Sequence, residues 1–178
     1  MITKHKSQRV VVLVDVQNMY YSAKNIYGKK LNFGALLKRL VGERELVRAI
    51  AYVIRAEIGE KEQAFYDALQ EEGFDIHEKE LQTFAGGAKK GDWDVGIAMD
   101  AIRYAPKIDS IVLVSGDGDF EPLVQYLKST FGTIVEVAAF GKTCSSKLKS
   151  SADEIFDIDK NTRTLLIRYK QYATKDRP

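Results

Sequence analysis

The sequence predicts an α/β fold in which helices cover both faces of a mainly parallel sheet. Two short runs of β-branched and aliphatic residues, at 10–14 and 111–114, are typical of strands that are buried on both faces. Amphipathic stretches, several of them followed by glycine, separate such runs and are typical of helices. Strands that alternate with helices form right-handed βαβ units, so we expect parallel strands between two layers of helices.

The individual elements follow from local patterns along the chain. Gly28 is placed to end the first helix, Asn32 to cap the second, and Pro122 is tolerated in the first turn of its helix. The expected helices are 17–27, 33–41, 61–72, 94–104, 120–131, 145–151 and a closing helix at about 162–172. The expected strands are 10–14, 46–54, 74–78, 110–115, 133–138 and 154–158. Residues 83–91 carry three glycines and two lysines and are expected to form an exposed loop.

Length and composition favour a single domain over residues 1–178, with its core at about 9–158. Of the 178 residues, 45% are hydrophobic and 29% are charged, which is typical of a globular protein. The one cysteine, Cys144, excludes an internal disulfide framework and a multi-cysteine zinc site. No apolar run approaches the roughly 20 residues that span a bilayer, and the basic N-terminus lacks a signal-peptide cleavage pattern. We therefore expect a cytoplasmic protein.

Two aspartates follow the two most strand-like runs. Asp15 comes directly after residues 10–14, and Asp117 follows residues 111–114 through Ser115 and a glycine. In parallel sheets, sites form at the carboxyl ends of strands where the strand order reverses. If the two strands are neighbours, the carboxylates repel each other, and a divalent cation removes that conflict by taking oxygen ligands from both. The alternative is that each aspartate only caps the helix or turn after it.

Four other aspartates are weaker candidates. Asp119 is placed either to join the cluster or to cap the helix that follows it, and Asp92 is better placed as a cap. Asp94 begins a helix, where a carboxylate is favoured by the helix dipole. Asp100 lies about 120° further round the same helix, where it can pair with Arg103 or bond solvent.

Nucleophilic catalysis is not favoured by the remaining residues. Cys144 has no evident partner base, and the two histidines, His5 and His77, lack ligand spacing and are expected at the surface. The net charge of +2 neither requires nor excludes nucleic acid as a partner.

Three motifs, in order, resemble those of the NYN domain family. They are Asp-Val-Gln-Asn at 15–18, Lys-Gly-Asp-Trp-Asp-Val at 90–95 with a downstream aspartate at 100, and Ser-Gly-Asp-Gly-Asp-Phe at 115–120. Residues 151–156, Ser-Ala-Asp-Glu-Ile-Phe, resemble the closing segment of the bacterial LabA-like branch of that family. The similarity covers roughly residues 9–158.

The resemblance implies a three-layer, PIN-like α-β-α fold and a metal-dependent ribonuclease that uses Mg²⁺ or Mn²⁺. By motif, the metal ligands and catalytic residues would be Asp15, Asp94, Asp117 and, completing the cluster, Asp119. Asn18 and Ser115 would orient a phosphate of the substrate or Asp15 itself. The chain has two residues between Gly91 and Asp94 where the motif has one, so Asp92 competes with Asp94, and the following Val95 favours Asp94.

The resulting hypothesis is metal-assisted hydrolysis of phosphodiester bonds in RNA, without a side-chain nucleophile. Lys90 either contacts substrate phosphates or is a solvated loop lysine. Tyr20 and Tyr21 are candidates for stacking on unpaired bases, although we expect one of them to pack in the core.

Several alternatives stay open at this point. DNA is not excluded as a substrate, and the sequence is compatible with a homodimer but does not establish one. A non-catalytic RNA-binding or regulatory module, or a small-molecule phosphohydrolase, would use the same pocket. A cluster of aspartates that repels phosphate is of little use to a pure binder, which favours catalysis.

Overall fold

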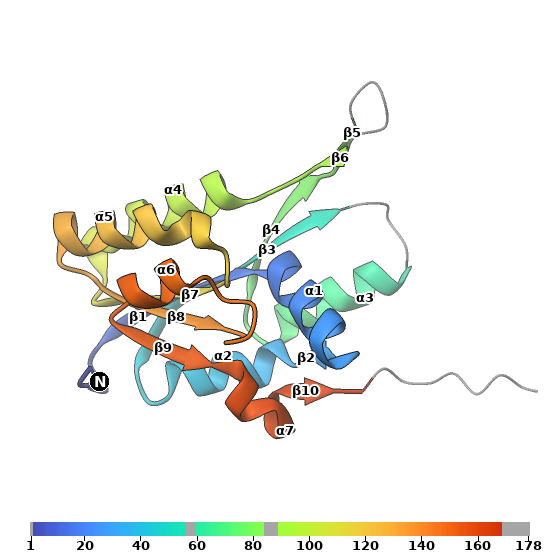
Figure 1. Cartoon of the computed structure of the whole chain (residues 1–178), viewed down its shortest axis with the longest axis horizontal. Coiled ribbons are helices and arrows are strands. Elements are labelled where there is room, and N and C mark those ends of the chain that lie inside the picture. The colour runs from blue at the N-terminus through green and yellow to red at the C-terminus, as the bar shows by residue number, and fades with distance from the viewer. Residues whose placement is uncertain (1, 56–59, 84–88, 169–178) are drawn as a thin grey trace, which may run out of the picture.

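The computed structural model describes residues 2–55, 60–83 and 89–168, and a six-stranded sheet forms its centre (Figure 1). The strand order is β4-β3-β1-β7-β8-β9, and every neighbouring pair is parallel. The strands are β1 (Arg9–Asp15), β3 (Glu45–Arg55), β4 (Asp75–Glu80), β7 (Ser110–Val114), β8 (Ile134–Ala139) and β9 (Glu154–Asp157). The predicted α/β fold with a parallel central sheet is confirmed.

Helices cover both faces of this sheet and give the three layers expected from the sequence (Figure 1). Helices α4 and α5 lie on one face, and α1, α2 and α3 lie on the other. The helices are α1 (Val16–Tyr27), α2 (Phe33–Val41), α3 (Glu60–Glu71), α4 (Asp94–Tyr104), α5 (Glu121–Phe131), α6 (Ser146–Ser151) and α7 (Thr162–Leu165). Within the described ranges, none of the helices is long and apolar enough to cross a membrane.

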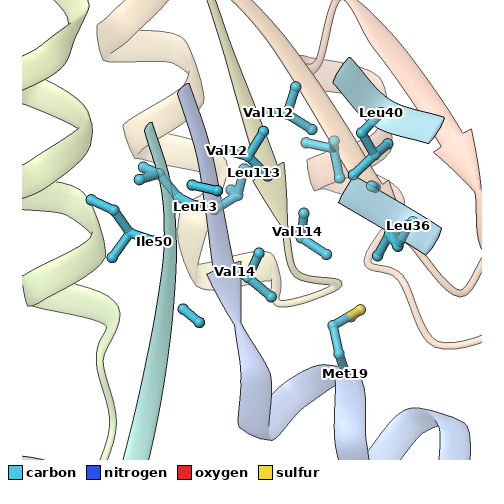
Figure 2. Close-up of a cluster of buried hydrophobic side chains, with 14 of the residues drawn as sticks. Val12, Leu13, Val14, Met19, Leu36, Leu40, Ile50, Val112, Leu113 and Val114 are labelled. Atoms are coloured by element: carbon cyan, nitrogen blue, oxygen red, sulfur yellow. The ribbon is translucent and has the colours of Figure 1, made fainter. Parts of the chain in front are cut away.

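The core lies on both faces of β1 and β7. Residues 10–14 of β1 and 111–114 of β7 are almost completely buried, as their uninterrupted aliphatic sequence predicted. Because side chains alternate along a strand, each strand contributes to the apolar layers above and below the sheet. Figure 2 shows one such cluster, which joins strand and helix residues: Val12, Val14, Val112 and Val114 with Met19, Leu36 and Leu40.

Two sequence predictions differ from the structure at the ends of segments. The closing helix predicted at 162–172 is wrong beyond Leu165, because β10 (Leu166–Ile167) pairs antiparallel with β2 (Lys30–Leu31) instead. That pairing buries Leu166, and the last four residues of the predicted helix lie outside the described residues. The predicted loop at 83–91 includes β6 (Lys89–Lys90), which pairs with β5 (Gln82–Thr83); residues 84–88 lie outside the description.

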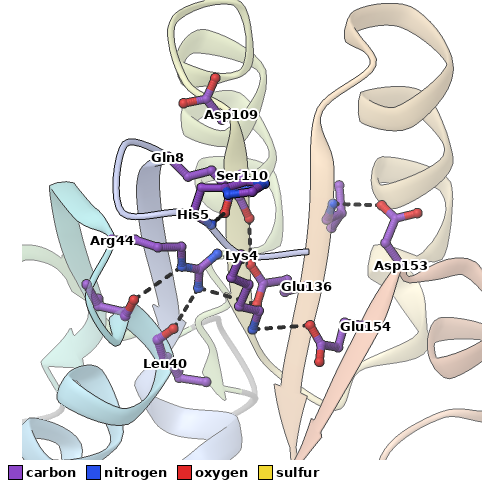
Figure 3. Close-up of polar contacts among 12 residues, drawn as sticks. Lys4, His5, Gln8, Leu40, Arg44, Asp109, Ser110, Glu136, Asp153 and Glu154 are labelled. Atoms are coloured by element: carbon purple, nitrogen blue, oxygen red, sulfur yellow. Dashed lines mark hydrogen bonds and ion pairs between the residues drawn. The ribbon is translucent and has the colours of Figure 1, made fainter. Parts of the chain in front are cut away.

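A buried ion pair joins the turn after α2 to β8 (Figure 3). The Arg44 guanidinium, whose side chain is 2% exposed, donates to the Glu136 carboxylate and to the carbonyl of Leu40 at the end of α2. Burial alone would raise the pKa of Glu136, but hydrogen bonds from Arg44, Lys4 and Ser110 hold it below its usual value. Together, these hydrogen bonds keep the Glu136 carboxylate ionised despite its burial.

We expect Glu136→Ala to lower the free energy of unfolding by about 3 kcal/mol, because it leaves the buried Arg44 charge without its partner. Urea titration at pH 7 measures this loss. The depressed pKa means that the stabilisation is present above the unfolded-state pKa of glutamate and is lost as pH falls through the folded-state value. The penalty of the variant should therefore shrink in acid.

Glu43→Ala is the matched control. The ion pair of Glu43 with Lys6 has an N–O distance of 3.2 Å, but both side chains are more than three-quarters exposed. Its removal should cost less than about 1 kcal/mol. Equal losses for the two alanine variants would contradict a special contribution from the buried pair.

Candidate active site

The strand order reverses between β1 and β7. From β1 the sheet continues through β3 to β4, and from β7 it continues through β8 to β9 in the opposite direction. The two central strands pair in register from Val10 with Ser110 to Val14 with Val114, so their carboxyl ends meet at one edge. A pocket of about 340 Å³ lies there, and Asp15 and Asp117 both line it. This is the position where open parallel sheets bind ligands.

Asp15 is both the last residue of β1 and the N-cap of α1. Its Oδ1 accepts a hydrogen bond from the backbone N–H of Asn18 at 3.0 Å, and its Oδ2 accepts one from Ser115 Oγ at 3.3 Å. Burial raises the pKa of Asp15, and the negative charge of Asp117 raises it further. Asp15 therefore caps α1 and lines the pocket at the same time.

Asn18 and Ser115 connect the two strand ends. The Asn18 side-chain oxygen accepts the backbone N–H of Gly116 at 3.1 Å, which ties α1 to the turn after β7. Ser115 is fully buried, and its hydroxyl both donates to Asp15 and accepts the backbone N–H of Asp117 at 3.2 Å. Asn18 lines the pocket, whereas Ser115 acts on it only through the two aspartates.

Asp117 caps the short turn that leads into α5. Its Oδ1 accepts the backbone N–H of Asp119 at 3.0 Å. Asp119 itself is exposed and is not among the residues that line the pocket. The N-cap position of α5 belongs to Phe120, so the capping role considered for Asp119 is not observed.

Trp93 fixes the start of α4 against the sheet. Its indole N–H donates to the carbonyl of Val53 in β3 at 2.8 Å, and its ring packs against Tyr52 with centroids 5.3 Å apart. The other side of the ring covers Gly96, where an added Cβ would come within 2.5 Å of a ring carbon. The first turn of α4, including Asp94, is therefore held at the pocket.

The charge environment of Asp94 shows that the carboxylates converge. Burial, as the largest cause, and the negative charges around Asp94 together raise its pKa to about 6. These charges belong, in decreasing order of effect, to Asp117, Asp92, Asp15 and Asp119. Asp92 and Asp94 both line the pocket, so both stay candidates for a ligand.

The donor set fits a hard divalent cation in its chemistry. Carboxylate and amide oxygens are the ligands that Mg²⁺ and Mn²⁺ prefer. Over residues 2–55, 60–83 and 89–168, no three acidic, histidine or cysteine side chains are close enough to hold one ion together. Magnesium is commonly held by one or two carboxylates, with water and substrate phosphate completing its shell. The arrangement therefore fits an ion that takes at most two protein carboxylates.

Asp100 faces away from the pocket into a separate cluster. It accepts a hydrogen bond from the Tyr52 hydroxyl at 2.7 Å and pairs with Arg103 at 2.7 Å, as its helix spacing allowed. His77 Nδ1 lies 3.3 Å from the same carboxylate. His77 keeps 33% of its side chain exposed at the surface, and its ring contacts those of Tyr52 and Trp93.

Sequence reasoning named only Tyr21 from one wall of the pocket. Ser22 and Asn25 of α1 line that wall beside Tyr21, together with Thr143 from the loop after β8. Tyr20 is 37% exposed and Tyr21 50%, so the prediction that one of them packs in the core is wrong. The backbone of Lys90 lies in β6, but its side chain is outside the described residues.

Comparison with known proteins gives the family of this fold and site. The sequence pattern of the NYN domain matches residues 9–159. The chain belongs to the NYN domain family. This family is of the PIN-like, nuclease type, and the chain is similar to the low amplitude and bright protein LabA of Synechococcus elongatus, with 27% identity over 165 residues and 86% of each chain covered. The LabA-like resemblance seen in the sequence is confirmed.

A solved structure supports the same assignment of fold. The NYN domain described here is similar to the crystal structure of a protein of unknown function from Vibrio parahaemolyticus. The two are 34% identical, the TM-score is 0.84, and the match covers 93% of this chain and all of the other.

We expect Asp94→Asn to stabilise the metal-free protein at pH 8. The raised pKa means that the folded state favours protonated over ionised Asp94. The free energy of unfolding is therefore highest below the unfolded-state pKa of aspartate and decreases as pH rises through about 6. A rise of about two units corresponds to roughly 3 kcal/mol, which solvent screening of a partly exposed group reduces to about 1 kcal/mol. Urea titration in chelator at pH 8 and pH 4 measures the gain.

The gain of Asp94→Asn should be present at pH 8 and nearly absent at pH 4. The control is Asp75→Asn. Asp75 is an exposed residue of the edge strand β4 and pairs with Arg48 of β3, so its substitution should change stability by less than about 0.5 kcal/mol. A variant that is less stable than the wild type at pH 8 would show that Asp94 is not under electrostatic stress.

Proposed function

We propose that this NYN domain is a metal-dependent ribonuclease that hydrolyses phosphodiester bonds in RNA. In this proposal Asp15, Asp94 and Asp117 hold one or two Mg²⁺ or Mn²⁺ ions, with no more than two carboxylates on each ion, and Asp119 contributes from the margin of the site. The observation that carries it is the convergence of carboxylates on one pocket, where burial and mutual repulsion raise the pKa of Asp15 and Asp94. Such a cluster favours cation binding, because a cation relieves the repulsion.

The residues of the pocket would have distinct tasks. Asp15 is held in place by Ser115 and by the backbone N–H of Asn18, so its carboxylate is oriented before any ligand arrives. Because the Asn18 oxygen is occupied by Gly116, its amide N–H₂ group is available as a donor for a phosphate oxygen in the pocket. A bound divalent cation would supply an activated water and neutralise charge on the leaving oxygen.

The state of Cys144 supports direct hydrolysis rather than a covalent intermediate. The thiol is 8% exposed, and burial raises its pKa, which lowers the fraction of reactive thiolate at neutral pH. Cys144 is not among the residues that line the pocket.

The proposed partner is RNA. Lys90 is a proposed contact for the phosphates of this RNA.

An RNA-cleavage assay with Mg²⁺ or Mn²⁺ tests the proposal. We expect Asp15→Asn and Asp117→Asn each to lower kcat/KM at least about 100-fold, a loss of roughly 2.7 kcal/mol of transition-state stabilisation. Chelation of the metal should abolish cleavage by the wild type.

Asp75→Asn, which removes a carboxylate far from the pocket on β4, is the matched control and should cleave at the wild-type rate. The proposal fails if the two pocket variants cleave as fast as this control, or if cleavage persists without divalent metal. Urea titration of each variant separates a loss of folding from a loss of chemistry.

A further inference from the structure

The pocket has two walls of different chemistry. The carboxylate wall consists of Asp15, Asp92, Asp94 and Asp117. The neutral wall consists of Tyr21, Ser22, Asn25 and Thr143, which carry one phenol, two aliphatic hydroxyls and one carboxamide but no charge. A cation at the carboxylate wall does not account for this part of the lining.

The neutral wall is built by α1 and the loop after β8. Tyr21, Ser22 and Asn25 share one side of α1, since positions four apart on a helix are neighbours. The Ser22 and Thr143 hydroxyl oxygens are 3.3 Å apart, a hydrogen bond that joins the helix to the loop. This hydrogen bond holds the two parts of the neutral wall together.

Tyr21 presents an accessible ring to this pocket. Its side chain is half exposed, and an edge contact with Tyr20, with centroids 5.5 Å apart, steadies it. Tyr21 follows Asp15 by six residues, roughly 9 Å along the helix axis. That separation is comparable to the reach from a phosphate to the base of the same nucleotide.

We propose that the neutral wall is a subsite for one unpaired nucleobase, stacked on Tyr21 while its phosphate lies at the carboxylate wall. This inference rests on the proposed function for the phosphate side and extends it to the base. A nucleotide has two parts that match the two walls. Its anionic phosphate would lie, through a cation, at the carboxylate wall, and its uncharged aromatic base, whose edge carries hydrogen-bond donors and acceptors, would lie at the neutral wall. Asn25 and the two hydroxyls are suited to that edge.

Stacking on Tyr21 selects an unpaired base. The pocket, of about 340 Å³, is at the lower end of the range for small-ligand sites, and a base can lay its face on the Tyr21 ring only when that face is not covered by a neighbouring base. A base must therefore leave its helix, or be unpaired already, before it stacks on Tyr21. The subsite makes single-stranded RNA the preferred substrate class.

Trp93 provides a signal for binding at this subsite. It is the single tryptophan of the chain, and it lines the same pocket. Its hydrogen bond to Val53 and its contact with Tyr52 fix the ring, so a change in its fluorescence reports on the pocket itself.

The first test is a titration of the full chain with adenosine monophosphate in the presence of Mn²⁺, followed by Trp93 fluorescence. Tyr21→Leu should bind about tenfold more weakly than the wild type, because stacking on an aromatic ring is lost. Tyr21→Phe should bind normally. Tyr126→Leu is the matched control, because Tyr126 is also an exposed tyrosine but lies on α5 and does not line the pocket, and it should stay within about twofold of the wild type.

Ribose 5-phosphate separates the base from the rest of the nucleotide. It carries the phosphate and sugar but no base, so it should bind equally to the wild type and to Tyr21→Leu. If its affinity falls as much as that of adenosine monophosphate, or if the Tyr126 and Tyr21 leucine variants behave alike, the base subsite is overturned.

Cleavage kinetics distinguish failure of this inference from failure of the ribonuclease proposal. With single-stranded RNA, Tyr21→Leu should raise KM about tenfold and change kcat less than threefold, and blunt duplex RNA should compete poorly. Cleavage that is indifferent to Tyr21 overturns the subsite but leaves the ribonuclease. Absence of cleavage, together with base-selective binding that depends on Tyr21, overturns the ribonuclease and supports the subsite.

Discussion

The in-register parallel pairing of β1 with β7 brings the polar groups of the site together. Both strands are covered by helices on both faces, so polar side chains have no place along them and appear where the strands end. The shared register puts Asp15 beside Ser115, and the hydrogen bond between them orients one aspartate while the Ser115 hydroxyl accepts the backbone of the other, Asp117. A slip of one residue would separate these groups and exchange the side chains that face the two apolar layers.

The site works against the stability of the protein that carries it. Several carboxylates share a partly buried pocket, and their repulsion is opposed by the apolar layers around the two central strands. Trp93 is part of the same balance, because its bond to Val53 and its cover over Gly96 hold α4 close to charges that repel its first residue. At the start of α4, the packing of Trp93 therefore opposes the repulsion between carboxylates that the proposed metal site needs.

Local sequence patterns predict the sheet and most helices but not the contacts between distant segments. The bounds 33–41 and 94–104 follow from caps and periodicity, and Asp15 and Asp117 follow from strand ends. The closing helix failed because β10 pairs with β2, which no local pattern reveals. The neutral wall beyond Tyr21 was missed for the same reason, since the bond between Ser22 and Thr143 joins residues 121 positions apart.

The N-terminal segment has a practical consequence for handling the protein. Lys4 bridges Glu136 on β8 and Glu154 on β9, and the carbonyl of Gln8 accepts the backbone N–H of Glu45 where β3 begins. The segment is thus fastened to the amino ends of the strands, whereas the pocket opens at their carboxyl ends. A sensor chip or a fusion partner coupled ahead of this segment would leave the pocket facing free solution.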